Sequence, residues 1–333
     1  MPDPVTKQRS HKNKDMTTQT ASAAGHQASN THPFFSNRRV VVLVASFCCL
    51  LWGSAYPAIK NGYAMFDIAA SDIPSKMVFA GYRFFFAGLV LLVLAVLSRR
   101  KIWVLNWQNL GSTTLLGLTQ TALQYVFFYV GLAYTTGVKS SIMNATTTFF
   151  SVLLAHFIYR NDRLNFNKVA GCLIGFIGVM VVNFSPDLLD FRFTLRGEGC
   201  VVIAAFILSA AMIYGKKLSQ RMDSMVLTGY QLSIGGLALV LGGYATGGIL
   251  HGFTLASTTL LIYMVLLSSA SFALWTALLK YNRVGLVAIF NFLIPIFGTV
   301  LSAIFLGENI FEWKNVIALA LVCSGIWLVT REH

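Results

Sequence analysis

The sequence predicts an all-α membrane protein with ten transmembrane helices arranged as two inverted five-helix repeats. Composition gives the first indication, since 56% of the 333 residues are hydrophobic, 11% are charged and the mean hydropathy is +0.67. A soluble domain carries roughly 25% charged residues, which cover its surface with polar groups. The other indications are ten long apolar runs and a similarity between two parts of the chain that lie 147 residues apart.

Each apolar run is close to the length of about 20 residues that an α-helix needs to cross the hydrocarbon core of a bilayer. The runs do not alternate between apolar and polar residues with a period of two, the pattern typical of an outer-membrane barrel. The predicted spans lie near residues 40–60, 77–98, 110–132, 138–159, 168–185, 198–215, 226–248, 258–279, 285–306 and 314–330.

The residues before the first span differ from the rest of the chain. Residues 1–38 are rich in Ser, Thr, Gln, Asn, Lys and His and show no apolar periodicity, so we expect them to form a disordered cytoplasmic tail. The two five-helix repeats are expected to occupy residues 39–185 and 186–333.

Basic residues orient the predicted spans. The N-terminal tail, the even-numbered connectors and the C-terminal end together hold 18 of the 25 Lys and Arg residues, whereas the odd-numbered connectors carry acids such as Asp67 and Asp72. Because Lys and Arg gather in cytoplasmic loops, both termini are predicted to be cytoplasmic, which requires an even number of spans. We therefore expect a multi-pass protein of the inner (plasma) membrane.

Two stretches of the chain align without a gap after a shift of 147 residues. YTTGVKSSIMNATTTFFSVLLAHFI, from Tyr134, then lies over YNRVGLVAIFNFLIPIFGTVLSAIF, from Tyr281, and Asn144 pairs with Asn291. Each half then holds five spans, and this odd number inverts the second half relative to the first. Inverted repeats around a midplane binding site are the architecture of many secondary transporters.

Four stretches carry a resemblance to a known family. They are WGSAYPAIK in the first span, the Arg of GYRFFFAG in the second, NFLIPIFGTVLSAIFLGE in the ninth and the Gly-rich last span of each half. Over residues 40–330 the chain resembles the drug/metabolite transporter (DMT) superfamily, specifically its EamA-like family. The resemblance implies two five-span halves and the export of amino acids or other metabolites, without naming a substrate. The first half departs from the family pattern, since Thr148 stands where a Pro is expected and Asp162 where a Glu is expected.

Sequence motifs of other functions are absent. H-E-x-x-H, G-x-x-x-x-G-K-[ST] and G-x-S-x-G do not occur, so no enzyme and no cofactor are predicted. The five Cys residues lie in apolar runs without a C-x-x-C pair, and no metal site is expected. The formal net charge of +13 is interpreted as membrane topology, so the expected partners are membrane lipid and a small-molecule substrate, and not nucleic acid.

Two cations at membrane depth are candidate substrate ligands, because charges inside a bilayer are costly and favour a functional explanation. Lys60 ends the first span, and Arg83 lies about two turns into the second. Either could attract a carboxylate or phosphate, and Arg83 could do so with two hydrogen bonds. The alternatives are that Lys60 reaches the interface and that Arg83 pairs with an acid or a helix-end carbonyl. No Asp or Glu lies near the centre of a predicted span, so the sequence does not support proton antiport.

Polar and aromatic residues in several spans are candidates for the lining of a binding site. Many have a partner four residues away on the same helix face, as Gln120 does for Gln124, although such pairs could equally bond one helix to another. The candidates are Trp52 and Tyr56 in the first span, Gln124 in the third, Asn144 in the fourth, Tyr214 in the sixth, Trp275 in the eighth and Asn291 in the ninth.

Two prolines are expected to bend the helices that carry these candidates. Pro57 removes the helical hydrogen bond to the carbonyl of Gly53, and Pro295 removes the bond to the carbonyl of Asn291. A freed carbonyl inside a membrane needs a donor, which a substrate ammonium, a water molecule or a packed side chain could supply.

Together these patterns predict a secondary transporter that exports a small polar metabolite, with an amino acid as the first candidate, by alternating access. The Gly-rich seventh span would permit close packing and rocking of the helices. Two alternatives stay open. One is an importer or exchanger of an anionic solute such as an organophosphate or nucleotide sugar, and the other is a membrane enzyme or assembly factor without a transport cycle.

Overall fold

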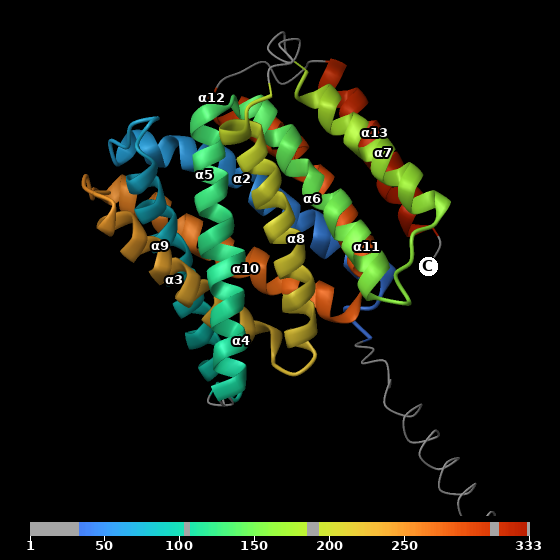
Figure 1. Cartoon of the computed structure of the whole chain (residues 1–333), viewed down its shortest axis with the longest axis horizontal. Helices are drawn as coiled ribbons and strands as arrows, with labels where there is room; N and C mark the ends of the chain where they lie inside the picture. Colours follow the sequence, from blue (N-terminus) through green and yellow to red (C-terminus); the bar gives the residue numbers. More distant parts are fainter. Residues whose placement is uncertain (1–32, 103–106, 185–192, 307–312, 332–333) are drawn as a thin grey trace, which may run out of the picture.

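A computed structural model describes residues 33–102, 107–184, 193–306 and 313–331, so residues 1–32 of the predicted tail lie outside the described residues. The described part of the chain folds into a bundle of apolar helices (Figure 1). The elements are α2 (Arg38–Met65), α3 (Ile73–Leu97), α4 (Trp107–Gly117), η1 (Leu118–Leu123), α5 (Gln124–Tyr134), α6 (Gly137–Ile158), α7 (Phe166–Val182), η3 (Leu195–Gly199), α8 (Cys200–Ser219), α9 (Ser224–Ala245), α10 (Leu255–Tyr281), α11 (Val284–Ala288), η4 (Ile289–Phe292), α12 (Leu293–Leu306) and α13 (Trp313–Thr330).

These elements form ten apolar segments within the described residues, which match the ten predicted spans to within a few residues. Nine of them are long and apolar enough to cross a membrane, and α7 is a shorter apolar helix of 17 residues. Three segments are composite: α4–η1–α5, η3–α8 and α11–η4–α12. The prediction of an all-α membrane protein with two five-helix repeats is therefore confirmed.

Short polar side chains start many of the helices. Asp223, for example, accepts hydrogen bonds from the backbone amides of Met225 and Val226 at the start of α9. Thr254 and Ser257 form a reciprocal capping box at the start of α10. The first amides of a helix lack intrahelical acceptors, so these caps fix where a span begins more sharply than hydropathy does.

Three of the described spans change their helical pitch. The third contains the six-residue π-helix η1, the sixth begins with the five-residue π-helix η3, and the ninth contains the 3₁₀ segment η4 just before α12. Pro295 lies in the first turn of α12, directly after η4. By contrast, α2 continues as an α-helix through the buried Pro57.

The pattern of contacts between helices stays the same when each helix is replaced by its counterpart in the other repeat. The exchange converts α2 into α8, α3 into α9, the α4–α5 span into α10, α6 into the α11–α12 span, and α7 into α13. The observed pairs α3–α9 and α7–α13 then convert into themselves, and α2–α12 and α2–α10 convert into α6–α8 and α5–α8, which are also in contact. This is the contact pattern expected of two inverted repeats.

Glycines bring the backbones together in the two helix pairs that convert into themselves. On α9, a Cβ added at Gly236 would lie 2.3 Å from the backbone nitrogen of Phe85 on α3. On α7, a Cβ at Gly171 would lie 2.7 Å from the carbonyl oxygen of Gly325 on α13. The expectation of close packing along the seventh span therefore holds at Gly236, while Gly242 faces only the side chain of Met77 at 3.6 Å.

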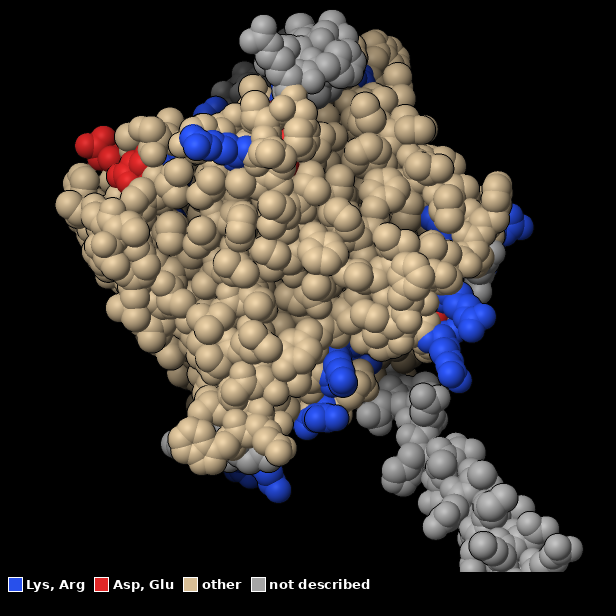
Figure 2. Space-filling view, in the orientation of Figure 1, with Lys and Arg blue, Asp and Glu red and all other residues tan. Residues whose placement is uncertain are grey.

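Alternate connectors meet at one end of the bundle, which we call the basic end (residues 98–102, 159–165, 219–223 and 280–283). Arg100 forms an ion pair with Asp223, and Nζ of Lys280 donates to the carbonyl of Met222 at 3.0 Å. Figure 2 shows Lys and Arg side chains along the lower edge of the molecule, and the central part of the visible face is free of charged atoms. The connectors therefore alternate between the two ends, as the positive-inside pattern requires.

A buried carboxylate joins the two repeats at the basic end. Oδ1 of Asp162 accepts a hydrogen bond from Nζ of Lys168 at 2.6 Å, and Oδ2 accepts one from the backbone amide of Gly285 at 2.9 Å. The neighbouring Tyr159 donates to the carbonyl of Ile213 at 3.3 Å. Burial, and secondarily the charge of Asp162, raises the pKa of Tyr159 to about 12, so this donor keeps its proton at neutral pH.

Candidate functional site

Arg83 is buried in the interior of the bundle, with 3% of its surface exposed. Its Nε donates a hydrogen bond to Oγ of Ser268 on α10 at 2.6 Å, and its guanidinium lies 5.0 Å from the centre of the Phe84 ring. The Ser268 hydroxyl donates its own proton to the carbonyl of Met264 at 2.8 Å, which leaves its oxygen free to accept from Arg83. Ser268 thus orients the guanidinium through one of its five N–H groups.

Aromatic side chains surround this arginine. Tyr63, Tyr125 and Tyr129 lie within electrostatic range of Arg83, and the ring centres of Tyr125 and Phe84 are 4.7 Å apart. Two of these tyrosines come from α5 and one from α2, so the environment of Arg83 is built from the first repeat and completed by α10.

The acids that the structure describes lie away from Arg83. Asp67 and Asp72 flank the connector between α2 and α3, and Glu198 is bonded by the hydroxyls of Thr135 and Thr194. Asp162 and Asp223 hold the basic end, as described above. The predicted alternative in which Arg83 pairs with an acid is therefore not what the described residues show.

A chain of ring contacts leads from Phe84 toward the basic end. Its ring centre is 5.9 Å from that of Phe272, which lies 5.5 Å from Trp52, and Trp52 in turn lies 5.0 Å from Trp275. Two predicted candidates from different repeats, Trp52 on α2 and Trp275 on α10, are thus in edge-to-face contact. Edge-to-face pairs at these separations stabilise the packing beyond the area that they bury.

A pocket opens beside the two tryptophans, toward the basic end. The pocket is narrow and partly open at the surface, with room in this state for about one water molecule. Its apolar wall includes the two Trp rings, and polar groups come from α4–η1, α8, α9 and α10. The lining includes Trp52, Gln120, Lys216, Gln231, Phe272 and Trp275.

Two of the predicted candidates carry a buried polar atom that meets no hydrogen-bond partner among the described residues. They are Nε1 of Trp275, whose residue is 3% exposed, and Oε1 of Gln124, whose residue is 4% exposed. A buried polar group without a partner costs roughly 1–3 kcal/mol, so native proteins rarely leave one unless a ligand or water completes it. Of the two residues, Trp275 belongs to the lining of the pocket and Gln124 does not.

Three features of this region were not predicted from the sequence. The π-helix η1 ends at the residue before Gln124, and π segments often occur at functional sites. Gln231 donates from Nε2 to Oγ1 of Thr121 at 2.7 Å. Lys216 lies at the pocket rim, where Nζ donates to the carbonyl of Asn282 and lies 5.3 Å from the centre of the Tyr159 ring.

A signal for Gln231 was present in the repeat. Thr121 and Ser268 are 147 positions apart, the same shift that aligns the two halves. Arg83 and Gln231, which bond to them, occupy the corresponding helices α3 and α9 with an offset of one residue. Comparison of polar residues across the shift would have placed Gln231 beside the known candidates.

Four predicted candidates lie outside this cluster. Lys60 is exposed, in agreement with the alternative that it reaches the interface. Tyr214 packs against the apolar cluster around Leu116 rather than lining the pocket. Asn144 and Asn291 are half-buried on α6 and η4 and are not part of the pocket lining.

Tyr56 lies between these groups. It is 39% exposed, and its ring would contact a Cβ placed at Gly298 on α12 at 3.0 Å. Tyr56 therefore connects α2 with α12, one helical turn from Trp52.

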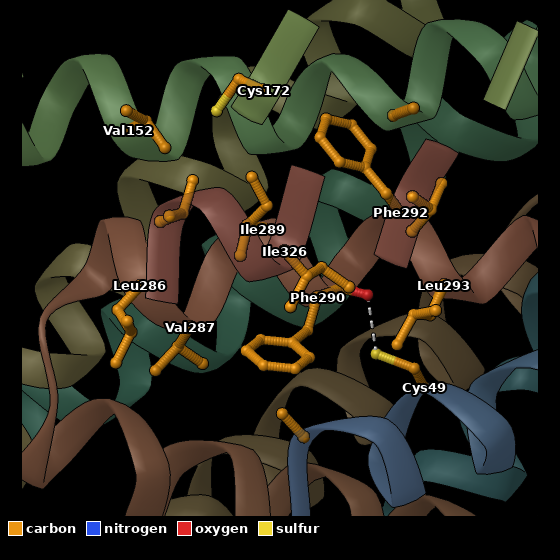
Figure 3. Packing of buried hydrophobic residues seen from close by; sticks show 14 of the residues in the cluster. Cys49, Val152, Cys172, Leu286, Val287, Ile289, Phe290, Phe292, Leu293 and Ile326 are labelled. Atoms are coloured by element: carbon orange, nitrogen blue, oxygen red, sulfur yellow. Dashed lines mark hydrogen bonds between the residues drawn. The ribbon is translucent and has the colours of Figure 1, made fainter. Parts of the chain in front are cut away.

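The carbonyls at the break in the ninth span are bonded by side chains of two other helices. Sγ of Cys49 on α2 donates to the carbonyl of Phe290 at 3.1 Å, as Figure 3 shows. Oγ1 of Thr148 on α6 donates to the carbonyl of Ala288 at 3.3 Å. Thr148, which replaces the expected Pro of the first repeat, thus bonds the span that contains the Pro of the second. The backbone amide of Leu293 donates to the carbonyls of Phe290 and Asn291, so packed side chains and the backbone both supply donors at this break.

The described residues contain no group of three or more His, Cys, Asp or Glu side chains that could hold a metal ion. In the last turn of α6, Nδ1 of His156 accepts a hydrogen bond from the backbone amide of Leu164 at 3.1 Å, so this side chain bonds the connector that follows the helix.

Comparisons with known proteins agree with this architecture. The sequence profile of the EamA-like transporter family matches residues 39–184 and 195–331. An uncharacterized transporter of Archaeoglobus fulgidus is 25% identical over 87% of this chain and 97% of its own length. The uncharacterized transporter YvbV of Bacillus subtilis is 26% identical over 87% of this chain and 91% of its own.

Two further comparisons concern function and fold separately. A protein of Salmonella typhimurium named a probable amino-acid metabolite efflux pump is 26% identical over 64% of this chain and 74% of its own length. A solved crystal structure superposes with a TM-score of 0.73 over 89% of this chain and 98% of its own, at 17% identity, which shows a shared fold. Because the family profile covers both halves, the resemblance noted in the sequence is confirmed, and the chain belongs to the EamA-like transporter family.

Proposed function

We propose that this transporter exports a small carboxylate, with an amino acid as the first candidate, across the inner membrane by alternating access. The observation that carries the proposal is Arg83, a buried arginine that meets no acid among the described residues. Charged groups inside a membrane are expensive and mark substrate pathways. A carboxylate is the ligand that such an arginine fits best.

The geometry leaves the guanidinium available. Nε is used by Ser268, and Nη1 and Nη2 have no acceptor among the described residues. Two parallel N–H groups match the two oxygens of a carboxylate, an arrangement that adds both energy and orientation. The rings of Tyr63, Tyr125 and Phe84 would receive the remainder of the molecule.

In the proposed cycle, a substrate would pass between the pocket beside Trp52 and Trp275 and Arg83 as the helices move. The indole N–H of Trp275 and the amide oxygen of Gln124 would bond the polar groups of a passing substrate. Alternating access would then move the helices of one repeat against those of the other, along the glycine contacts of α3–α9 and α7–α13. With both termini cytoplasmic, as the basic residues indicate, the basic end faces the cytoplasm and export starts at the pocket.

The similarity to a probable amino-acid metabolite efflux pump supports an amino acid as the first candidate. The chain has no nucleotide-binding motif, so the gradient of the substrate or of an ion would drive transport.

A second candidate function is the import or exchange of an anionic solute such as an organophosphate or nucleotide sugar. Lys216 favours it, since this second cation belongs to the lining of the pocket. A phosphate would accept hydrogen bonds from both cations in turn.

Release from proteoliposomes tests the proposal. Vesicles holding the purified protein and a radiolabelled mixture of the protein amino acids should lose label faster than vesicles without protein. A Lys60→Gln variant serves as the control, because Lys60 is exposed and should release label like the wild type. If label stays inside while a radiolabelled sugar phosphate is released, the second candidate replaces the first; if neither leaves, both are wrong.

A further inference from the structure

We infer that the protein exchanges one carboxylate for another faster than it returns empty, so that its principal mode is counter-exchange across the membrane. The inference rests on the proposed function and adds how its transport cycle is coupled. It follows from a positive charge at mid-depth whose surroundings are electrically neutral when no substrate is bound.

Arg83 lies deep between the two ends of the bundle. It follows the start of α3 by ten residues and precedes the end by fourteen, which corresponds to roughly 15 Å and 21 Å along the helix. Its side chain is 3% exposed, so solvent does not screen the guanidinium in this state. The charge is therefore held in a medium of low dielectric constant.

Only neutral groups solvate this charge among the described residues. The hydroxyl of Ser268 accepts one hydrogen bond at 2.6 Å, the ring of Phe84 lies 5.0 Å away, and tyrosine side chains supply further dipoles. The buried acid Asp162 is bonded to Lys168 at the basic end and is not available to Arg83. The empty site thus carries an uncompensated positive charge.

A bound carboxylate supplies the missing counter-charge. During alternating access the carrier passes through a state in which its binding site is closed to both sides, and a buried charge without a partner is strongly unfavourable in such a state. In the loaded carrier the carboxylate pairs with Arg83 throughout this step. In the empty carrier no negative group pairs with Arg83, so the free-energy barrier to the return of the empty carrier is higher.

The inference also applies to an amino acid, whose ammonium leaves the substrate neutral overall. The carboxylate still pairs with the guanidinium, while the ammonium can bind against the faces of Tyr63 and Tyr125 or remain hydrated. The local field at Arg83 is what changes between the empty and the loaded carrier.

The test compares release into two external solutions. Proteoliposomes are loaded with the radiolabelled amino-acid mixture and diluted either into buffer or into buffer with the same mixture unlabelled. Release into the unlabelled mixture should be at least about tenfold faster than release into buffer, since a tenfold ratio needs only about 1.4 kcal/mol between the two return barriers.

A second variant gives the empty carrier its own counter-charge. In Ser268→Asp, a carboxylate takes the place of the hydroxyl that accepts from Nε of Arg83, so the ratio of the two release rates should fall toward one. Ser268→Asn is the matched control, because it has nearly the same shape without the charge and should keep the wild-type preference. Size-exclusion profiles in detergent verify that both variants fold.

The outcomes separate the two levels of the proposal. Equal release into both solutions by the wild type overturns counter-exchange and leaves the proposed function standing. If folded Ser268→Asp and Ser268→Asn give the same ratio of release into the unlabelled mixture to release into buffer, the charge of Arg83 is not the cause of the exchange. If no label is released into either solution, the proposed function is wrong, and the exchange falls with it.

Discussion

The Arg83–Ser268 bond and the Gln231–Thr121 bond occupy equivalent places in the two repeats and differ in charge. Each donor lies on one helix of the α3–α9 pair, and each acceptor is a hydroxyl at positions related by the shift of 147 residues. Both bonds tie the second helix of one repeat to the third helix of the other. Both repeats thus have the same hydrogen bond between helices, but only the first repeat has a charged donor in it.

Replacing the charged donor should have the largest effect. Arg83→Gln keeps a donor to Ser268 and removes the ion pair with the substrate, so we expect transport of the amino-acid mixture to fall by about 100-fold, the equivalent of about 3 kcal/mol. Initial rates in proteoliposomes measure it. A rate close to that of the wild type would mean that the two bonds are equivalent and that Arg83 is a packing residue.

The next largest effect is expected at the contact between α3 and α9, the helices that carry Arg83 and Gln231. Gly236→Ala should lower the free energy of unfolding by about 1–3 kcal/mol, because its Cβ would meet the backbone nitrogen of Phe85 at 2.3 Å. Thermal unfolding in detergent measures the change. Gly242→Ala on the same helix is the control, since its nearest neighbour is Met77 at 3.6 Å, and equal behaviour of the two variants would contradict backbone contact between α3 and α9.

Removing the neutral donor should affect stability more than transport. Gln231→Leu leaves the buried hydroxyl of Thr121 without its donor, at a cost of about 1 kcal/mol in unfolding free energy. Transport, normalised to folded protein, should fall less than about tenfold. A loss as large as that of Arg83→Gln would remove the distinction between the two repeats.

The smallest effect is expected at the break in the ninth span. Thr148→Val removes the hydroxyl that bonds the carbonyl of Ala288 at 3.3 Å, and about 0.5 kcal/mol of unfolding free energy should be lost. Denaturation followed by tryptophan fluorescence can resolve it, with Thr146→Val as the control because that hydroxyl bonds within its own helix. If Thr148→Val and the wild type unfold at the same midpoint, the carbonyl of Ala288 needs no donor from α6.

The number and limits of the spans could be predicted from the sequence because bilayer thickness sets the length of an apolar helix. The repeat, and with it the inverted architecture, followed from the alignment of Tyr134 with Tyr281. Bonds between helices could not be predicted in this way, since they depend on how each helix is rotated against its neighbours. Lys60 and Arg83 were equal candidates on hydropathy, and only packing against α9 and α10 buries one and exposes the other.

The candidate site was accordingly predicted in part. Trp52 and Trp275 were proposed separately, and the structure brings them into contact across the repeats. Lys216 was assigned to a connector because it lies near the end of an apolar run, although α8 continues to Ser219 and the pocket reaches it. The π-helix η1 has no local sequence signature, since it arises from backbone hydrogen bonds that shift by one residue inside a packed span.

The contact between Asp162 and Gly285 has a consequence for how the protein is made. Asp162 is synthesised 123 residues before Gly285, whereas Lys168, the donor to its Oδ1, belongs to the same repeat. Oδ2 of Asp162 gains its donor only once the segment that contains Gly285 has been synthesised. The first repeat alone therefore lacks the donor to Oδ2 of Asp162, and the two halves, although duplicated in sequence, are not interchangeable modules.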